Sequence, residues 1–109
     1  MAHKAVSAVM DKQASEIVLL DIRIPSGFAD YFVICNAEST RQMDAVGEEV
    51  DKQLSLHGVK LIHREGNNES GWLLLDFGAV IVHIFSPDQR EFYQLDKLWD
   101  KAPVVVKIQ

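Results

Sequence analysis

The residues of this sequence that could most readily bind a metal ion are its four histidines. They lie far apart, at His3, His57, His63 and His83. A zinc site built from a local motif needs histidines or cysteines a few residues apart, and the sequence has no H-x-x-x-H pair and no Cys/His cluster. His83 alternates with Val82 and Ile84 inside an apolar run, which is typical of a hydrogen-bonded histidine in a core or an interface. We therefore predict no metal site.

Three aspartates on predicted strands could hold Mg²⁺ for phosphoryl transfer if they came in pairs. Asp21, Asp30 and Asp76 are isolated, however, and the chain has neither an Asp-x-Asp motif nor a G-x-x-x-x-G-K-[ST] loop. It also lacks a G-x-S-x-G elbow for a serine nucleophile. Asp76, directly before Phe77-Gly78, is typical of a turn residue. These residues predict neither catalysis nor a cofactor.

The two tryptophans allow two interpretations. Trp72 follows a polar loop and Trp99 ends a predicted helix, so neither lies in the middle of an apolar element. Aromatic side chains with arginine at the ends of elements are typical of the anchors of protein–protein interfaces. Tryptophan is also often partly buried at the edge of a core in any fold. The sequence leaves both interpretations open.

The elements that must position these side chains follow a mixed α/β order. Apolar runs over 72–76 and 79–85 flank Phe77-Gly78, which predicts a β-hairpin with both faces covered. In chain order we expect a helix over about 2–14, strands over 17–24 and 30–36, a helix from Ser39, a strand over 59–64, the hairpin, and a helix from Ser86. The fold class is a small mixed β-sheet with helices packed on it.

Capping patterns and apolar stripes define the two later helices. Ser39 with Gln42, and Ser86 with Gln89, are capping-box patterns. The expected stripes are Met43, Val46, Val50 and Leu54 in one helix, which Gly58 closes, and Phe92, Leu95 and Trp99 in the other. Residues 25–27 and 65–70 are expected to be turns or loops. Residues 103–109 form a C-terminal tail that either adds an edge strand or lies along a partner.

Composition and charge exclude several classes of protein. The 109 residues are 48% hydrophobic and 25% charged, which predicts one globular domain over 1–109. The net charge of -5 argues against direct nucleic-acid binding, because phosphates repel an acidic surface. Cys35 lies in an apolar run and is expected to pack as a small hydrophobic residue. The chain shows no signal-peptide core and no membrane-spanning segment, so we expect a cytoplasmic protein.

Taken together, these residues resemble the Iojap family, the ribosomal silencing factors. The resemblance covers about residues 5–103, and its pieces occur in the family's order and spacing. They are the run from Asp30 to Cys35, Ser39, Arg41, Glu65-Gly66, Trp72, Asp76, Gly78, the run from Val80 to His83, Phe85, Arg90, Tyr93, Leu95, Leu98 and Trp99. One departure is Ala79, where the family usually has an acid. An aspartate would suit a tight turn better, because alanine tolerates positive φ poorly.

The resemblance implies a fold related to nucleotidyltransferases without their catalytic carboxylates. It also implies binding to the large ribosomal subunit, through large-subunit ribosomal protein number fourteen, on the face that meets the small subunit. Occupying that face would block subunit joining and repress translation when nutrients are short. The resemblance further implies that the protein forms a homodimer and uses no cofactor. An acidic domain fits docking on a basic ribosomal protein better than direct contact with RNA.

For the partner-binding surface we expect Glu65, Trp72, Asp76, His83, Arg90, Tyr93 and Trp99. The tryptophans would be apolar anchors, and Glu65 and Asp76 would face basic groups of the partner. To the core we assign Val33, Ile34, Val46, Val50, Ile81 and Ile84. Two alternatives remain open at this point: a nucleotidyltransferase-like enzyme that binds Mg-nucleotide, and a dimeric adaptor that acts away from ribosomes.

Overall fold

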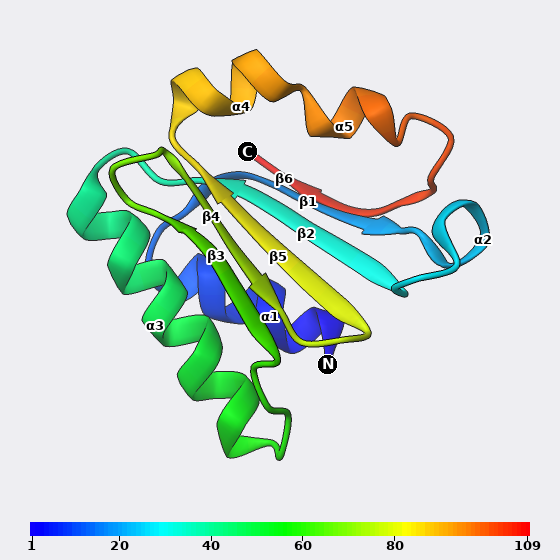
Figure 1. Cartoon of the computed structure of the whole chain (residues 1–109), viewed down its shortest axis with the longest axis horizontal. Coiled ribbons are helices and arrows are strands. Elements are labelled where there is room, and N and C mark those ends of the chain that lie inside the picture. Colours follow the sequence, from blue (N-terminus) through cyan, green and yellow to red (C-terminus); the bar gives the residue numbers. More distant parts are fainter.

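Six strands form one mixed sheet, and helices pack on both of its faces (Figure 1). The structure is a computed structural model and describes residues 1–109. The strands are β1 (Ser15–Asp21), β2 (Tyr31–Asn36), β3 (His63–Asn67), β4 (Trp72–Asp76), β5 (Val80–Phe85) and β6 (Val104–Ile108). The helices are α1 (Ala2–Asp11), α2 (Arg23–Ser26), α3 (Thr40–Leu56), α4 (Pro87–Tyr93) and α5 (Leu95–Leu98). The predicted fold class is confirmed, whereas the relationship to nucleotidyltransferases stays a prediction.

The strand order in the sheet is β3-β4-β5-β2-β1-β6. β2 and β5 run parallel, and every other pair of neighbours is antiparallel. A parallel pair needs a long crossover connection, which here consists of α3, β3 and β4. β5 is buried along its whole length and β2 along nearly all of it, as expected for apolar strands at the centre of a sheet. β2 and β5 thus form the centre of the sheet.

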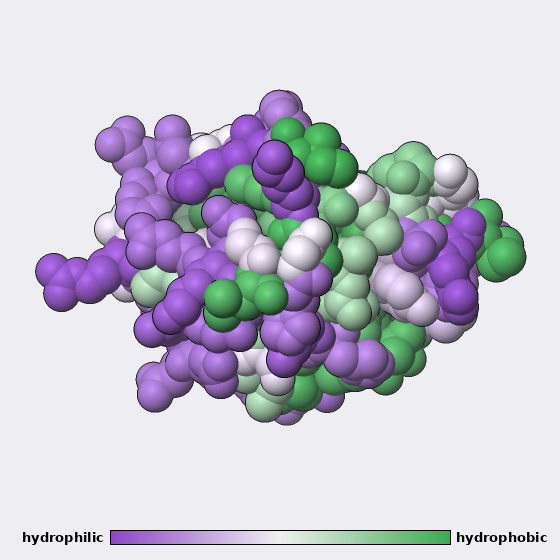
Figure 2. All heavy atoms as spheres, turned by 90° about the horizontal axis from the view of Figure 1, so that it is seen from below, coloured by the Kyte–Doolittle hydropathy of each residue, from purple (hydrophilic) through white to green (hydrophobic).

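Helices α1 and α3 cover one face of the sheet. Met43, Val46, Val50 and Leu54 of α3 are all at most 1% exposed, so the predicted stripe is confirmed. They pack in one cluster with Val9 of α1 and with sheet residues such as Val33 and Val82. Figure 2, the view from below, shows hydrophilic side chains over the end of the molecule that α3 occupies. The outer surface of α3 is therefore solvated.

Helix α5 and the loops beside it cover part of the other face. Leu95 and Ala102 pack there against Phe32 and Ile34 of β2. The core residues expected from the sequence are all buried, at 8% exposure or less: Val33, Ile34, Val46, Val50, Ile81 and Ile84. The two sheet faces therefore carry separate apolar clusters, with the strands between them.

The first strand ends earlier than predicted. β1 stops at Asp21, and Ile24 lies in the short helix α2, where it is 94% exposed. The carboxylate of Asp21 accepts hydrogen bonds from the backbone N–H and the side chain of Arg23, which turns the chain out of the sheet. The expected turn over 25–27 is accordingly one short helix that ends at Gly27.

The third strand lies further along the chain than predicted. The prediction of 59–64 followed the apolar residues, but β3 spans His63–Asn67, and all five of its residues are exposed. Val59 instead continues the end of α3, because its N–H donates to the carbonyl of Leu54. Pairing with β4 places Glu65 in a strand, so the prediction of a loop over 65–70 is also wrong for residues 65–67.

The predicted single helix after Ser86 is two short helices. Gln94 adopts a left-handed conformation (φ 47°, ψ 49°), which ends α4 and starts α5. The chain direction changes there, so Phe92 is 75% exposed while Leu95 is buried. The expected stripe of Phe92, Leu95 and Trp99 is therefore wrong. Ser86 does cap α4, its hydroxyl accepting from the N–H of Gln89 at 3.3 Å.

Only half of the capping box predicted for α3 is present. The Ser39 hydroxyl accepts from the backbone N–H of Gln42 at 3.0 Å. The Gln42 side chain does not return to Ser39; it accepts from the N–H of Glu38 and donates to the carbonyls of Lys12 and Gln13. Gln42 thus ties the start of α3 to the end of α1.

The C-terminal segment joins the sheet. Of the two alternatives for residues 103–109, the structure has the edge strand, with β6 antiparallel to β1. No helix in the structure has the length and hydropathy needed to cross a bilayer.

Candidate protein-binding face

One face of the sheet is left open at its β3–β4 end. Glu65 pairs with Leu74, and Leu74 pairs with His83, so these three side chains form one row on the same face. This is the face on which α5 packs, but α5 lies over β1 and β2. Leu74 and Trp72 stay half-buried as a result. The expectation that both faces of β4 are covered is therefore wrong, and the uncovered part is the candidate site.

A hollow of about 200 Å³ lies on this open part of the face. Its lining consists of Glu65, Gly66, Ser70, Trp72, Leu74 and Tyr93; we call it the β3–β4 hollow. Three of the seven residues expected at a partner-binding surface thus come together, although they lie on β3, β4 and α4. The site offers aromatic rings, an aliphatic side chain and one exposed carboxylate.

The backbone of the β3–β4 hairpin shapes the hollow. Gly66 has φ of 79°, and a Cβ at this position would lie 2.0 Å from the carbonyl oxygen of Trp72. Only glycine permits that approach. The Ser70 hydroxyl stabilises the same turn, because its one proton is shared between the carbonyls of Asn67 and Trp72 at 2.9 and 3.1 Å. The hairpin therefore holds Trp72 at the rim of the hollow through its main chain.

Aromatic contacts hold the Trp72 ring from two sides. Its centroid is 4.8 Å from that of Phe85 on the sheet and 4.6 Å from that of Tyr93 on α4. Tyr93 is 43% exposed and contacts Phe92 edge-on at 5.0 Å. An anchor with one apolar side packed and another accessible is the usual form of an interface hot spot.

His83 lies beneath Trp72 and is only 4% exposed. Its Nδ1 accepts a hydrogen bond from the indole N–H of Trp72 at 3.2 Å, whereas its Nε2 has no hydrogen-bond partner. Burial lowers the pKa of His83 to about 3, so the ring is neutral at physiological pH. The structure places this residue below the surface, beneath Trp72, so its expected role in partner binding stays a prediction. The prediction of a hydrogen-bonded core histidine is confirmed.

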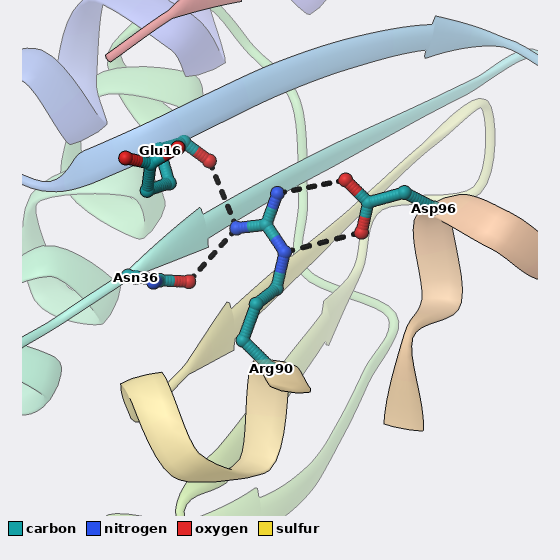
Figure 3. Close-up of polar contacts among 4 residues, drawn as sticks. All are labelled: Glu16, Asn36, Arg90 and Asp96. Atoms are coloured by element: carbon teal, nitrogen blue, oxygen red, sulfur yellow. Dashed lines mark hydrogen bonds and ion pairs between the residues drawn. The ribbon is translucent and has the colours of Figure 1, made fainter. Parts of the chain in front are cut away.

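The Arg90 side chain points toward Glu16, Asn36 and Asp96 (Figure 3), and it is not part of the lining of the hollow. Its Nε and Nη2 donate to the two carboxylate oxygens of Asp96 at 3.1 and 2.8 Å. Its Nη1 donates to the carbonyl of Glu16 and to Oδ1 of Asn36, both at 2.8 Å. Burial raises the pKa of Asp96, but hydrogen bonds from Arg90 and its charge outweigh this and hold the pKa below its usual value. Arg90 therefore joins α4, α5, β1 and β2.

The two remaining expected residues lie away from the hollow. Asp76 is at the far end of β4, about 13 Å from Trp72 along the strand, and its Oδ1 accepts from the N–H of Gly78 at 2.7 Å. The prediction of a turn residue is thus confirmed. Trp99 packs on Phe32 at 5.4 Å and on Phe28 at 6.0 Å, where it covers the edge of the core. Their role in binding stays a prediction.

The departure at Ala79 does not strain the turn. Gly78, with φ of 89°, takes the left-handed conformation, and Ala79 is not among the residues with positive φ. The carbonyl of Ala79 accepts from the N–H groups of Asp30 and Tyr31. The expectation that an aspartate would suit this position better for conformational reasons is therefore wrong.

Leu74, Gly66 and Ser70 belong to the hollow but were absent from the expected set. A signal for them existed in the sequence: the run from His63 to Asn67 has no apolar residue, which is typical of an exposed edge strand. Such an edge strand has no apolar side chain on which a covering layer could pack, so the sheet face beside it is left open to solvent. That pattern therefore indicates that one face of β4 is open.

The other reactive residue types form no further site. Cys35 is fully buried, and burial raises the pKa of its thiol to about 12. The residue packs as the small hydrophobic group expected. The structure contains no group of three or more His, Cys, Asp or Glu side chains placed to hold a metal ion.

The sequence pattern of one protein family, described as "Ribosomal silencing factor during starvation", matches residues 1–109. The chain belongs to this family. A ribosomal silencing factor of Halalkalibacterium halodurans is 41% identical over 101 residues, which are 93% of this chain and 86% of that protein. A mouse protein named "Mitochondrial assembly of ribosomal large subunit protein 1" is 32% identical over 97 residues, 86% of this chain and 42% of that protein.

Solved structures agree with this membership of the silencing-factor family. A crystal structure of a Bacillus halodurans protein superposes with a TM-score of 0.82 at 38% identity, over 95% of this chain and 94% of that one. A crystal structure from Chromobacterium violaceum gives a TM-score of 0.86 at 28% identity, over 95% and 88%. The predicted resemblance to the silencing factors is thereby confirmed.

Proposed function

We propose that this chain binds the large ribosomal subunit on the face that meets the small subunit and so blocks subunit joining. The contact would be large-subunit ribosomal protein number fourteen, and the effect would be repression of translation under nutrient limitation. Membership of the silencing-factor family over the whole chain carries the proposal. The name of the mouse relative, which refers to assembly of the large ribosomal subunit, supports the choice of subunit.

The β3–β4 hollow is the surface we propose for this contact. Trp72 and Tyr93 offer accessible aromatic area beside the half-buried Leu74. Such rings lose little conformational entropy when they are covered, because neighbouring groups already hold them. An apolar side chain of the partner would enter the hollow and exclude water from both rings.

The charge around the hollow supports a basic partner. Glu65 is exposed at its edge, and its contact with the His63 ring is long (3.5 Å) and exposed, so the carboxylate is available. Other exposed acids lie on the flanking elements: Glu69 in the hairpin turn, and Asp88 and Glu91 on α4. A ribosomal protein with basic side chains would complement this arrangement.

The proposal includes three further points. The protein acts by occupying a surface, with no catalytic turnover, so Mg-ATP should leave its thermal unfolding temperature unchanged. It works in the cytoplasm, as expected from the sequence. The free chain forms a homodimer, which analytical ultracentrifugation would detect as a species of about twice the 12.3 kDa chain mass.

Subunit rejoining tests the proposal. Purified small and large subunits are mixed with magnesium, with or without the protein, and resolved on a sucrose gradient. We expect the joined peak to fall and the protein to sediment with the large subunit. Trp72→Ala and Tyr93→Ala should each weaken this association by roughly tenfold or more, because each removes a hot-spot ring.

Leu56→Ala is the matched control for these variants. Leu56 is 71% exposed at the end of α3, on the opposite side of the sheet, so its loss should change neither joining nor association. An unchanged joined peak, with the protein remaining at the top of the gradient, would overturn the proposal and favour an adaptor that acts away from ribosomes.

A further inference from the structure

The indole N–H of Trp72 has one hydrogen-bond partner, and that partner is buried. The donor is directed into the sheet, where it meets Nδ1 of His83 at 3.2 Å. Trp72 itself is half-buried, and its ring forms part of the β3–β4 hollow. The orientation of the exposed edge of the ring therefore depends on a hydrogen bond below the surface.

This hydrogen bond defines the chemical state of His83. An indole N–H can only donate, so Nδ1 must be an unprotonated acceptor and the ring proton must be on Nε2. Nε2 has no hydrogen-bond partner, and the ring packs edge-on against Phe32 with 4.6 Å between the centroids. Burying an N–H without a partner costs free energy. A histidine serves packing alone poorly here, because an aliphatic residue would avoid that cost.

His83 is well placed to act as a fixed acceptor. β5 lies between β4 and β2, so both of its edges are paired and its backbone cannot shift easily. The histidine ring contacts Phe32 on one side and is nearly parallel to Phe85, with 6.3 Å between the ring centroids. An acceptor that is fixed in this way also fixes the orientation of the donor group that bonds to it.

We propose that His83 is a positioning residue that holds the Trp72 indole in its binding orientation at the β3–β4 hollow by accepting its N–H. Without the acceptor, the N–H would face an apolar surface, and the ring would turn to bring that group to water. The turn would move the ring away from Tyr93 and change the shape of the hollow. This inference rests on the proposed function for its effect on binding, but its effect on Trp72 stands alone.

Two substitutions separate the hydrogen bond from packing. His83→Asn keeps an oxygen close to the position of Nδ1, so it can still accept from Trp72, but it removes ring volume from the core. His83→Leu fills the core with apolar atoms but has no acceptor. Packing and hydrogen bonding therefore predict opposite orders for the two variants.

The first readout is the indole N–H signal of Trp72 in a ¹H–¹⁵N NMR spectrum, assigned with Trp99→Phe. In the wild type and in His83→Asn we expect a hydrogen-bonded signal that exchanges slowly with solvent. In His83→Leu the signal should move upfield and exchange at least several-fold faster. This measurement needs no ribosome, so it tests the positioning even if the proposed function fails.

The second readout is affinity for the large subunit, compared with the urea midpoint of unfolding. His83→Leu should bind roughly tenfold more weakly than the wild type while unfolding at an equal or higher urea concentration. His83→Asn should bind more tightly than His83→Leu while unfolding at a lower concentration. Affinity that follows stability in both variants, or an unchanged indole signal in His83→Leu, would overturn the proposal. A wild type that does not bind would instead refute the proposed function.

Discussion

His83 shows how one buried residue makes stability depend on pH. Its pKa in the folded protein is about 3, compared with 6.5 for an ordinary histidine, because burial disfavours the charged ring. Below pH 6.5 the unfolded chain binds a proton that the folded chain does not. Lowering the pH therefore favours unfolding until the pH approaches 3. Burial is the cause of this shift; Glu65 shares the row of His83, and Arg90 on α4 is bonded to Asp96.

We predict that this residue contributes a measurable loss of stability in acid. The free energy of unfolding should fall by about 1.4 kcal/mol per pH unit below 6.5, or by about 2 kcal/mol at pH 5, relative to a chain without the histidine. Urea unfolding of the wild type and of His83→Leu at pH 7.5, 6.0 and 5.0 measures the difference. Other titrating groups cancel in that comparison. Equal pH dependence in the two proteins would show that His83 takes up a proton as readily when folded as when unfolded.

At the scale of the elements, Arg90 decides where α4 and α5 lie. These helices are short, so their own hydrogen bonds stabilise them little. The guanidinium group makes four hydrogen bonds, two to Asp96 of α5 and one each to Glu16 of β1 and Asn36 of β2, and the Arg90 side chain is only 14% exposed. Because Tyr93 is on α4, this network also sets one wall of the β3–β4 hollow. Arg90 thus supports the candidate site without contacting it.

Removing the Arg90 network should destabilise the protein and weaken binding together. Arg90→Ala leaves the Asp96 carboxylate and the Asn36 side chain unpaired, and we expect a loss of about 2–3 kcal/mol in the free energy of unfolding. Arg90→Lys should recover only part of it, because an ammonium group cannot reproduce the two-pronged contact. Urea unfolding measures the stability of both variants, and the sucrose gradient with large subunits measures their association. Arg41→Ala is the control, an exposed arginine for which no change is expected.

Helix α3 makes a close approach to the sheet at Gly47. A Cβ at this position would lie 2.8 Å from Cδ2 of Leu73, a fully buried side chain of β4. We predict that Gly47→Val destabilises the protein by about 2 kcal/mol, because the added Cβ and its two methyl groups cannot fit without moving the helix. Glu48→Val introduces the same side chain at a solvent-exposed position of α3, where it meets no sheet residue. Equal urea midpoints for the two variants would contradict this account of the packing.

The elements that sequence patterns predicted well are those in which local periodicity and burial agree. The stripe of Met43, Val46 and Val50 repeats with the helical period, and the structure buries it. Phe92 and Trp99 also have helical spacing, but the left-handed Gln94 interrupts the helix, and no glycine, asparagine or proline signals the break. The meeting of Glu65, Trp72 and Tyr93 depends on strand order and on the path of α4. Those are long-range properties that one sequence does not encode locally.

At the scale of the whole molecule, the two faces of the sheet differ in what they present to solvent. Helices α1 and α3 cover one face, and the outer surface of α3 is hydrophilic (Figure 2). The other face exposes aromatic rings at the β3–β4 hollow with acids around them. The net charge of -5 attracts a basic partner from a distance, whereas the hollow contributes only once the partner is in contact with it. Long-range attraction should therefore govern how fast a basic partner arrives, and the hollow how long it stays.

Two charge reversals on opposite faces can separate these contributions. Glu48→Lys on α3 and Glu65→Lys at the hollow each change the net charge from -5 to -3, because each replaces one negative charge with one positive charge. At low salt, both should slow association with the large subunit by roughly two- to threefold. Only Glu65→Lys should also speed dissociation.

At about 0.5 M salt, screening should remove the effect of Glu48→Lys, because exposed charges then act over only a few ångströms. Surface plasmon resonance with immobilised large subunits measures both rates. Faster dissociation of Glu48→Lys would place the contact on the α3 face and contradict the choice of the hollow.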